Sequence, residues 1–403
     1  MNYLIYLSNI FFIAVISMAN AVAAEPPPEL VQDVNNSFIC VFKDDVPAAN
    51  VPGLAKGLVN KQNGAIRHHF TTAIKGFSAR ISANAAENIA SHNPNIAYCE
   101  PNGLAQADGL AGGKGGKGGK PNPQPAAQIT PAGVTMVGGP VDVTGWGLTA
   151  WIIDSGIDVD HPDLNVDVSR GANFVSKGKS TIDDGNGHGT HVAGTLAAID
   201  NDIDVVGVAA GATVVPVRVL NNANWATYDD MIAGIDYVAA MAQPGDVANM
   251  SIWAHEHVES LHQATMGLAN KIPFVVIAGN DGEDINLSPS EPAHVEHANL
   301  YTVSAVDFNG QFTSFSNFGN SDSRECGTND PYPCAAVDIA APGQDVTSLQ
   351  PGGGLATWYG TSMAAPHVAA VILLLGGNPP TTAGTATNDP DNQPDPIVKY
   401  SNP

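Results

Sequence analysis

Apolar and polar positions in the first hundred residues follow one pattern. Short apolar segments predict strands at residues 37–43, 66–70, 76–81 and 96–100, and helix-like segments occupy residues 50–62 and 84–91. The order β-α-β-β-α-β predicts a small ferredoxin-like α+β sandwich over residues 37–106. The Pro-rich stretch before it, residues 25–36, is expected to be disordered.

The pattern changes from residue 127 onward. Strands that are apolar throughout are predicted at residues 149–153, 214–220, 246–252, 273–278, 301–306 and 337–339, and they alternate with helices at residues 188–199, 229–241, 257–268 and after Ser362. Such alternation predicts an α/β domain over residues 127–403, with a mainly parallel sheet covered by helices on both faces. Functional residues of such sheets gather at the carboxyl ends of strands. The tail from residue 378 is rich in Pro, Asp and Thr and lacks clear strands, so it is expected to complete the domain loosely or be trimmed.

Two segments lie outside these domains. Residues 1–24 are largely apolar and end in small residues, which predicts a secretory signal peptide and a secreted, extracellular protein; no Lys or Arg precedes the apolar run, so an uncleaved anchor is the alternative. Residues 107–126 carry a Gly/Lys repeat and alternating prolines. This composition predicts a flexible linker, with a basic recognition tract as the alternative.

Charge and cysteine content narrow the function. The 403 residues carry a formal net charge of -23 with only 16 Lys and Arg, so binding to nucleic acid and stable association with membranes are not expected. The protein is expected to be a monomer. Four cysteines in an exported chain suggest disulfides. Of three possible pairings we favour Cys40–Cys99, on neighbouring strands, and Cys326–Cys334, across a short loop; four buried thiols are the alternative.

Three polar residues stand where chemistry is expected. Ser362 follows a glycine and opens an apolar helix, where it is either a nucleophile or an N-cap. Asp154 ends a strand and either orients a histidine or shapes an Asx-turn. His188 lies between glycines at the start of a helix. His188 and His191 are spaced for a metal, but no third ligand follows, so His191 is interpreted as a packing residue.

Asp, His and Ser together favour nucleophilic catalysis. A serine hydroxyl becomes a nucleophile when an imidazole accepts its proton, and a carboxylate fixes the imidazole tautomer. Acyl transfer also needs donors for the oxyanion. Asn280 follows an apolar strand, and its side-chain amide is the expected partner of the Ser362 N–H in that role.

The motifs around these residues resemble those of the subtilisin-like serine proteases. The segments DSGID, HGTHVAG, AGN and GTSMAAPH occur in that family's order, from Gln128 to about Gly376. Residues 37–106 resemble the family's propeptide, which acts as intramolecular chaperone and temporary inhibitor. In that family the propeptide abuts the enzyme, whereas here a linker intervenes, so self-cleavage is expected near Asp108 or near Ala126.

The resemblance also implies a structural calcium ion. The family's site uses a Gln near the mature N-terminus, an Asp in an HPDL segment and a loop after the His helix. The matching residues are Gln128, Asp163 and Asn201, with backbone carbonyls from Ile199, Ile203 and Val205. Six oxygens suit Ca²⁺, and a hydrogen-bonded loop without an ion is the alternative.

Substrate is expected to lie as an extended strand between two segments of the enzyme. By resemblance, the binding residues are Asn224, Trp225, Ala226, Tyr228, Ser251, Ile252, Trp253, Ala278 and Gly279. The chain departs from the family at Trp253, where glycine is typical, and Trp225 stands on the other segment. The two indoles are expected to narrow the cleft or to stack on an aromatic side chain of the substrate. The alternative is that both tryptophans lie on the surface and have no role in specificity.

The sequence therefore predicts a secreted, calcium-stabilised serine endopeptidase, made as a self-inhibited precursor that cleaves protein and peptide substrates. Asp154, His188 and Ser362 are the predicted triad, and Asn280 and Ser362 the oxyanion hole. Two alternatives stay open: a non-catalytic binding protein that retains the fold, and a transpeptidase or peptide cyclase in which an amine replaces water.

Overall fold

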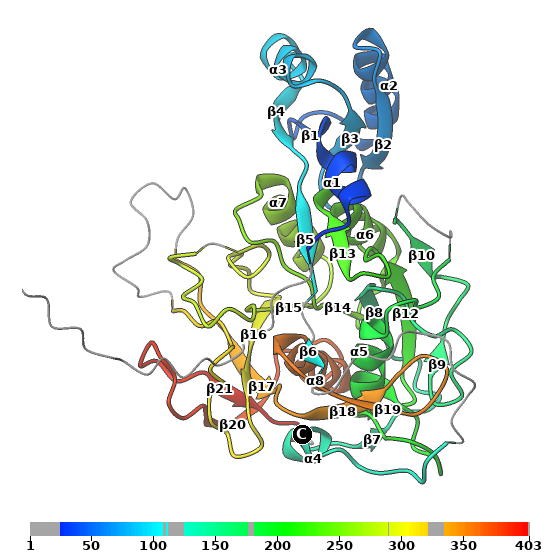
Figure 1. Cartoon of the computed structure of the whole chain (residues 1–403), viewed down its shortest axis with the longest axis vertical. Helices are drawn as coiled ribbons and strands as arrows, with labels where there is room; N and C mark the ends of the chain where they lie inside the picture. Colours follow the sequence, from blue (N-terminus) through cyan, green and yellow to red (C-terminus); the bar gives the residue numbers. More distant parts are fainter. Residues whose placement is uncertain are drawn as a thin grey trace, which may run out of the picture.

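The computed structural model describes residues 25–107, 110–111, 125–175, 181–288, 290–320 and 334–401. A small N-terminal domain stands on a larger domain, and one extended segment of chain connects them (Figure 1). The predicted signal peptide, most of the predicted linker and Cys326 lie outside the described residues, so the Cys326–Cys334 pairing stays a prediction. No described helix is long and apolar enough to cross a membrane.

The small domain has the predicted element order. Its elements are β1 (Ser37–Phe42), η1 (Ala48–Asn50), α2 (Val51–Lys61), β2 (Ala65–Phe70), β3 (Gly76–Arg80), α3 (Ala83–His92) and β4 (Ile96–Pro101). The four strands form one sheet in the order β2-β3-β1-β4, and every pairing is antiparallel. Residues of α2 and α3 share a core with Cys40, Phe42 and Phe77 of the sheet, because both helices pack on the same face.

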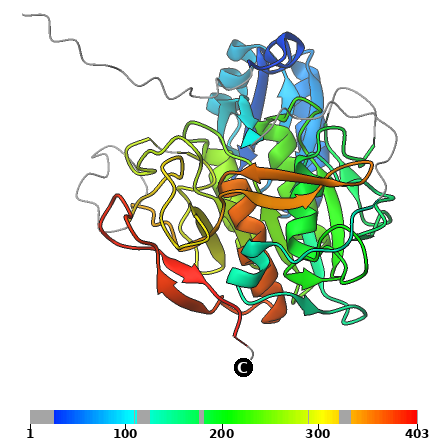
Figure 2. The ribbon, with the colours of Figure 1, turned by 60° about the horizontal axis from the view of Figure 1, so that its bottom comes forward.

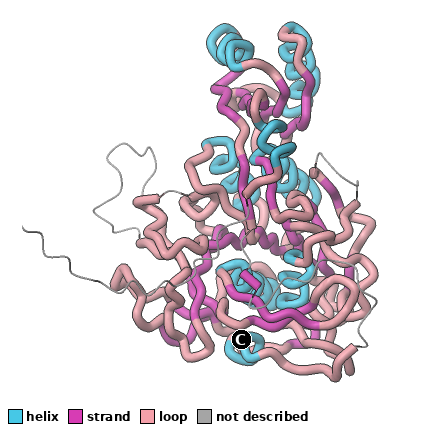
Figure 3. The backbone as a smooth tube through the Cα atoms, viewed as in Figure 1, coloured by secondary structure: helices cyan, strands magenta, loops and turns pink. Residues whose placement is uncertain are grey.

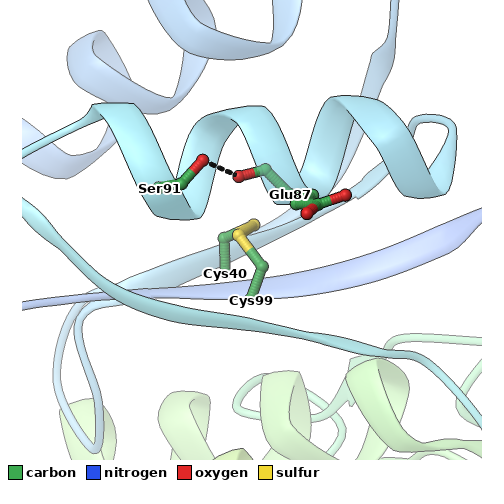
Figure 4. The surroundings of a disulfide bond; sticks show 4 residues. All are labelled: Cys40, Glu87, Ser91 and Cys99. Carbon is green, nitrogen blue, oxygen red and sulfur yellow. Dashed lines mark hydrogen bonds between the residues drawn. A yellow bond between two sulfur atoms is a disulfide. The ribbon is translucent and has the colours of Figure 1, made fainter.

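A disulfide joins the two strands that the sequence predicts to be neighbours. Cys40 of β1 lies directly opposite Cys99 of β4, and the two sulfur atoms are bonded (Figure 4). Helix α3 crosses above this bond, and Ser91 on it donates a hydrogen bond to the Glu87 carbonyl oxygen. The predicted Cys40–Cys99 pairing is confirmed.

The expected disorder of residues 25–36 is wrong. Helix α1 (Pro28–Val34) forms there, with Pro28 at its first position, where a missing N–H costs nothing. Leu30 is buried, and the buried Asp33 carboxylate pairs with both Arg67 and Arg80. These partners lie more than thirty residues away along the chain, so local composition does not reveal them.

The larger domain is built on one long sheet. Its strands run in the order β10-β12-β8-β14-β15-β16-β17-β21-β20, with β9 beside β12. All neighbours are parallel except β20 and β21. The bounds are β8 (Thr149–Asp154), β9 (Asn165–Val166), β10 (Ala172–Asn173), β12 (Thr213–Arg218), β14 (Val247–Met250), β15 (Phe274–Ile277), β16 (Leu300–Val306), β17 (Ile339–Pro342), β20 (Thr382–Thr385) and β21 (Pro396–Val398).

Helices cover both faces of this sheet (Figure 3). Strand β8 is buried throughout, and its side chains alternate between two cores. Ile152 packs with α5 (His188–Ala197) and α8 (Thr361–Leu374), and Ile153 packs with α6 (Tyr228–Met241) and α7 (Glu259–Ala269). The predicted α/β fold with a doubly covered, mainly parallel sheet is confirmed.

Short elements complete the domain. They are α4 (Ala132–Met136), β7 (Val141–Asp142) paired with β11 (Ala209–Ala210), β5 (Leu104–Gln106) paired with β13 (Trp225–Thr227), and β18 (Val346–Leu349), β19 (Leu355–Tyr359) and β6 (Leu110–Ala111) in a three-stranded sheet.

The expectation that the tail lacks strands is wrong. Strand β21 extends the main sheet beside β17, and β20 pairs with β21 at the edge shown in red in Figure 2. Val398 is fully buried, and Asp395 accepts a hydrogen bond from Ser304 of β16 at 2.5 Å. Pro is disfavoured inside strands but is tolerated at Pro396, the first residue of β21, and β20 contains neither Pro nor Asp.

Candidate active site

Asp154 and His188 meet at the carboxyl end of the central strand. Asp154 is the last residue of β8, and His188 is the first residue of α5. His188 Nδ1 lies 2.8 Å from Asp154 Oδ1 and 2.9 Å from Oδ2, and both side chains are buried. Gly187 precedes the helix with φ 114°, a conformation that favours glycine. The carboxylate therefore holds the imidazole by Nδ1 and leaves Nε2 as the ring's other functional nitrogen.

A second buried carboxylate fixes the start of α5. Asp184 accepts hydrogen bonds from the backbone N–H of Gly187 and from the N–H and hydroxyl of Thr190. It also accepts one from the Ser155 hydroxyl, which in turn accepts from the Gly189 N–H. Burial raises the pKa of Asp184. Sequence reasoning missed Asp184, although an Asp three residues before a glycine that opens a helix is a usable signal.

Ser362 lies at the N-terminus of the helix that packs against α5. It is the second residue of α8, after Gly360 at φ 146°, and it is fully buried. Its hydroxyl lies 3.4 Å from the carbonyl oxygen of Ser251, and the Ser251 hydroxyl donates back to the Ser362 carbonyl oxygen at 3.1 Å. Ser251 follows β14, the strand next to β8, so these contacts bring Ser362 to the same sheet edge as Asp154.

Asn280 is oriented by the residue before Ser362. The Thr361 N–H donates to Asn280 Oδ1 at 2.8 Å, and the Thr361 hydroxyl donates to the same oxygen at 3.0 Å. With Oδ1 held in this way, the amide group Nδ2 is directed away from Thr361. This orientation suits a donor for an anionic oxygen beside Ser362.

An indole that sequence reasoning missed packs on both histidines. Trp358 of β19 stacks on His188 at 6.1 Å between ring centroids and on His191 at 4.7 Å. His191 Nε2 lies 3.2 Å from the carbonyl oxygens of Val346 and Ala356. Burial lowers the pKa of His191 to about 3, so this ring is neutral. The interpretation of His191 as a packing residue is supported.

The two predicted substrate segments hold a strand of the protein itself. Strand β5 pairs antiparallel with β13, and on its other side Gln106 exchanges two backbone hydrogen bonds of 3.1 Å with Trp253. The Ala107 N–H donates to the Asn224 carbonyl oxygen, and Asn224 Nδ2 donates to the Ala107 carbonyl oxygen. Residues 104–107 therefore complete a three-stranded arrangement in the cleft where substrate is expected.

A second short strand of this segment also pairs with the larger domain. Residues 110–111 form β6, which pairs antiparallel with β19, Leu110 opposite Tyr359. Tyr359 lies three residues before Ser362. The described backbone before residue 108 and after residue 109 is thus paired with the larger domain.

The remaining predicted binding residues differ in position. Tyr228 donates a hydrogen bond from its hydroxyl to Glu256, and its ring packs against Gly103. Ala226 pairs with Ala105 in register, whereas the side chains of Ile252 and Ala278 belong to buried apolar clusters. Ile252 and Ala278 therefore contribute to the scaffold beneath the cleft.

The two tryptophans have different environments. Trp253 is 1% exposed, and its ring covers Gly279, where an added Cβ would lie 2.5 Å from an indole carbon. Its ring centroid is 4.2 Å from that of His255. Trp225 is half-buried and lines a cavity together with Leu30 of α1. The indole of Trp253 therefore lies between a cleft edge and the strand end that carries Asn280, and a surface location is excluded for it.

The predicted calcium residues converge in one loop. Asn201 donates from its side chain to Asp163 at 2.7 Å, and its N–H donates to the Gln128 side chain at 2.6 Å. The Ile199 N–H donates to the Asp163 carbonyl oxygen, and residues Ile203 and Val205 pair with the chain on either side of Gln128. Burial raises the pKa of Asp163 to about 7, and the buried charge of Asp204 adds to this.

The mainly parallel α/β sheet and the residues gathered at its carboxyl edge are those of a serine hydrolase. A family model described as the subtilase family matches residues 146–387. Subtilisin NAT of Bacillus subtilis subsp. natto is 29% identical over 95% of this chain and 90% of its own length. An intracellular serine protease of Paenibacillus polymyxa is 36% identical over 61% of this chain and 72% of its own. A crystal structure of a cold adapted subtilisin-like serine proteinase aligns with a TM-score of 0.56 at 29% identity, over 69% of this chain and 100% of that one.

The chain belongs to the subtilase family and is a subtilisin-like serine-type endopeptidase.

Proposed function

We propose that the protein hydrolyses peptide bonds through Asp154, His188 and Ser362. The observation that carries this proposal is the buried Asp154–His188 pair at the N-terminus of α5, with Ser362 opening the helix packed beside it. Ser362 Oγ attacks the scissile carbonyl carbon while His188 Nε2 accepts its proton. His188 then gives the proton to the leaving amine, and water repeats the sequence on the acyl-enzyme. Asp154 accepts the hydrogen bond from His188 Nδ1 and stabilises the imidazolium.

The oxyanion is bound by two donors in this mechanism. The Ser362 N–H is free of helical partners because it lies in the first turn of α8. Asn280 supplies its amide, which the two Thr361 donors orient by holding Oδ1. Both donors lie at the positive end of the helix dipole, where the charge develops.

We infer that the chain is a self-inhibited precursor, with residues 37–106 as the propeptide domain, 107–126 as the linker and 127–403 as the peptidase domain. Residues 104–107 occupy the cleft as a central strand, and β6 continues on the far side. This geometry favours cleavage between Ala107 and Leu110 over the alternative near Ala126. Arg67 reinforces the contact by pairing with Asp229 and Asp230 at the start of α6.

Calcium fits the loop around Asp163. Asp163 and Asp204 are both buried, the charge of Asp204 raises the energetic cost of ionising Asp163, and no Lys or Arg side chain pairs with either among the described residues. Bound Ca²⁺ would be held by Gln128, Asp163, Asn201 and the carbonyls of Ile199, Ile203 and Val205, and would neutralise this charge. Carboxylate, amide and carbonyl oxygens are the ligands that Ca²⁺ prefers.

We further propose that the protein is secreted after removal of residues 1–24 and that Trp253 restricts the residue accepted before the scissile bond. The disulfide between Cys40 and Cys99 is consistent with an oxidising destination. The indole fills space beside Gly279 that a large side chain of the substrate would otherwise occupy.

The Ser362→Ala variant tests the proposal. We expect it to accumulate as an uncleaved precursor and to lose peptidase activity and labelling by a fluorophosphonate probe. Ser348→Ala is the matched control, since Ser348 is also buried and hydrogen-bonded but donates to the His191 carbonyl oxygen. Normal processing and labelling of Ser362→Ala would contradict the assignment, and N-terminal sequencing of the mature wild-type protein locates the cut.

A further inference from the structure

Three histidines surround one buried glutamate beneath the substrate-binding edge. Glu291 is completely buried, and its Oε1 lies 2.9 Å from His257 Nδ1 and 2.9 Å from His262 Nδ1. His294 follows Glu291 by three residues in a tight turn closed by its N–H bond to the Ser290 carbonyl oxygen. His257, Glu291 and His294 each offer a ligand atom within 4.8 Å of the others. None of these residues belongs to the proposed catalytic, oxyanion or calcium groups.

One oxygen of this carboxylate has no partner among the described residues. Glu291 Oε2 is buried, and among the described residues it has no hydrogen-bond partner. A buried carboxylate oxygen without a donor is costly, and a bound cation is one way of satisfying it. Oε2 belongs to a glutamate whose neighbours are imidazoles, which are good ligands for first-row divalent metals.

A second cluster of histidine and carboxylate side chains differs from the Glu291 cluster in its charge balance. His68, Asp229 and Asp230 also lie within ligand distance of one another. There, however, the Arg67 guanidinium occupies the centre, with Nε 2.5 Å from Asp229. A fixed cation already neutralises those carboxylates, so the cluster is an ion-pair network. Around Glu291 the described contacts with basic side chains come from histidines alone, which can exchange a proton for a metal.

We propose that His257, Glu291 and His294 bind a zinc ion. Two imidazoles and one carboxylate form a ligand set that Zn²⁺ takes in proteins, with a fourth position for water or another side chain. Tetrahedral ligands about 2 Å from zinc lie about 3.3 Å apart. His257 Nδ1 and Glu291 Oε1 are already separated by 2.9 Å, so small side-chain movements complete the site. His262 holds the same carboxylate and orients it.

The ion would brace the cleft edge. The Ala254 N–H donates to the Glu291 carbonyl oxygen at 2.8 Å, and the Glu291 N–H donates back to Ala254 at 3.2 Å. Ala254 follows Trp253, the residue that pairs with Gln106 in the cleft. His257 and His262 come from the segment around the start of α7, whereas Glu291 and His294 come from the turn beyond β15. Zinc would therefore tie two separate segments together directly behind the substrate edge.

Calorimetric titration of the full-length precursor tests this proposal. The precursor carries Ser362→Ala to keep it intact, is freed of metal by a chelator, and is titrated with zinc chloride in excess calcium, which fills the calcium loop. We expect one zinc ion per chain, and at least about 100-fold weaker binding in His294→Gln, because loss of a ligand costs more than loss of a supporting contact. His297→Gln is the matched control: this half-buried histidine lies three residues further on, outside the cluster, and its substitution leaves zinc binding unchanged.

A second measurement needs no substitution at the site. Zinc is expected to protect the half-buried His257 from diethyl pyrocarbonate, while His297 stays reactive, as mapped by mass spectrometry. Absence of saturable zinc uptake, undiminished uptake by folded His294→Gln, or protection confined to other histidines would overturn the proposal. Neither readout involves peptidase activity, so its failure is distinguishable from failure of the proposed catalytic mechanism.

Discussion

His188 Nδ1 is placed almost equally far from both carboxylate oxygens of Asp154, at 2.8 and 2.9 Å. The carboxylate therefore constrains the ring from two directions and fixes the tautomer that presents Nε2 as a base. The carboxylate is also held in place, because the Ser155 N–H donates to Asp154 Oδ1 at 2.7 Å. The orientation of His188 thus depends on two acceptor oxygens of Asp154, and the amide of an asparagine at this position would supply only one.

Asp154→Asn is expected to lower kcat/KM by about four orders of magnitude, because the amide favours the wrong imidazole tautomer. The variant should fold, since asparagine has nearly the same shape. Activity is measured on a peptide substrate with the mature enzyme, produced by supplying the propeptide in trans and removing it with a second protease. Asp142→Asn, at an exposed position, serves as control. Retention of more than about a tenth of the activity would contradict the role of Asp154.

Much of the fold follows from the sequence because its strands are apolar throughout. Burial on both faces leaves a continuous apolar signal in β8 and β15, and glycine marks the start of α5 and α8. Helix α1 and strand β21 leave no such signal. Their stability comes from partners far away in sequence, Arg67 and Arg80 for α1 and β17 for β21, which composition cannot reveal.

The candidate site is predictable to a similar extent. Asp154, His188, Asn280 and Ser362 lie in motifs whose residue types carry the chemistry. Asp184 was missed because its importance lies in burial and in the backbone donors it collects. The position of residues 104–107 in the cleft depends on strand register between distant segments, and a sequence pattern contains no such register.

Removal of calcium is expected to destabilise the protein. Without the ion, the buried carboxylates of Asp163 and Asp204 repel each other in a site where no Lys or Arg pairs with either among the described residues. We expect a chelator such as EGTA to lower the Tm of the Ser362→Ala precursor, and excess calcium to restore it. Asp163→Asn should show a smaller calcium-dependent change in Tm, since it removes the main ligand charge. An equal calcium response in this variant would place the ion elsewhere.

The C-terminal strand is expected to make stability depend on pH. Burial, with the charges of Asp389 and Asp391, raises the pKa of Asp395 to about 8. Since the folded chain holds this proton more tightly than an unfolded aspartate with a pKa of about 3.9, the resulting stability is fully present below that value. It is lost as the pH rises through 8, at up to about 1.4 kcal/mol per pH unit.

Asp395→Asn should remove this dependence, because asparagine retains an acceptor for the Ser304 hydroxyl and does not titrate. The free energy of unfolding, measured with denaturant between pH 5 and pH 9 on the Ser362→Ala precursor, should fall less steeply in the variant. Asp345→Asn, an exposed substitution, should leave the slope unchanged. Parallel slopes for Asp395→Asn and its parent would show that the proton is not taken up at Asp395.

Trp253 is expected to determine which residue precedes the scissile bond. Its indole covers Gly279 beside Asn280 and is fully enclosed, so a large substrate side chain meets the ring in that space. Replacement by glycine removes the ring and opens the pocket. We expect Trp253→Gly to raise kcat/KM for substrates with Phe or Leu at this position relative to Ala by about 10- to 100-fold, the range for the fit of a few carbon atoms in an apolar pocket. Cleavage profiling on a peptide library measures the ratio.

Trp225→Ala is the matched control, since Trp225 pairs with the same strand but lines a cavity near α1. This variant should change the preference several residues away from the cut. An unchanged preference in Trp253→Gly, with normal folding and catalysis, would mean that the primary pocket is formed elsewhere.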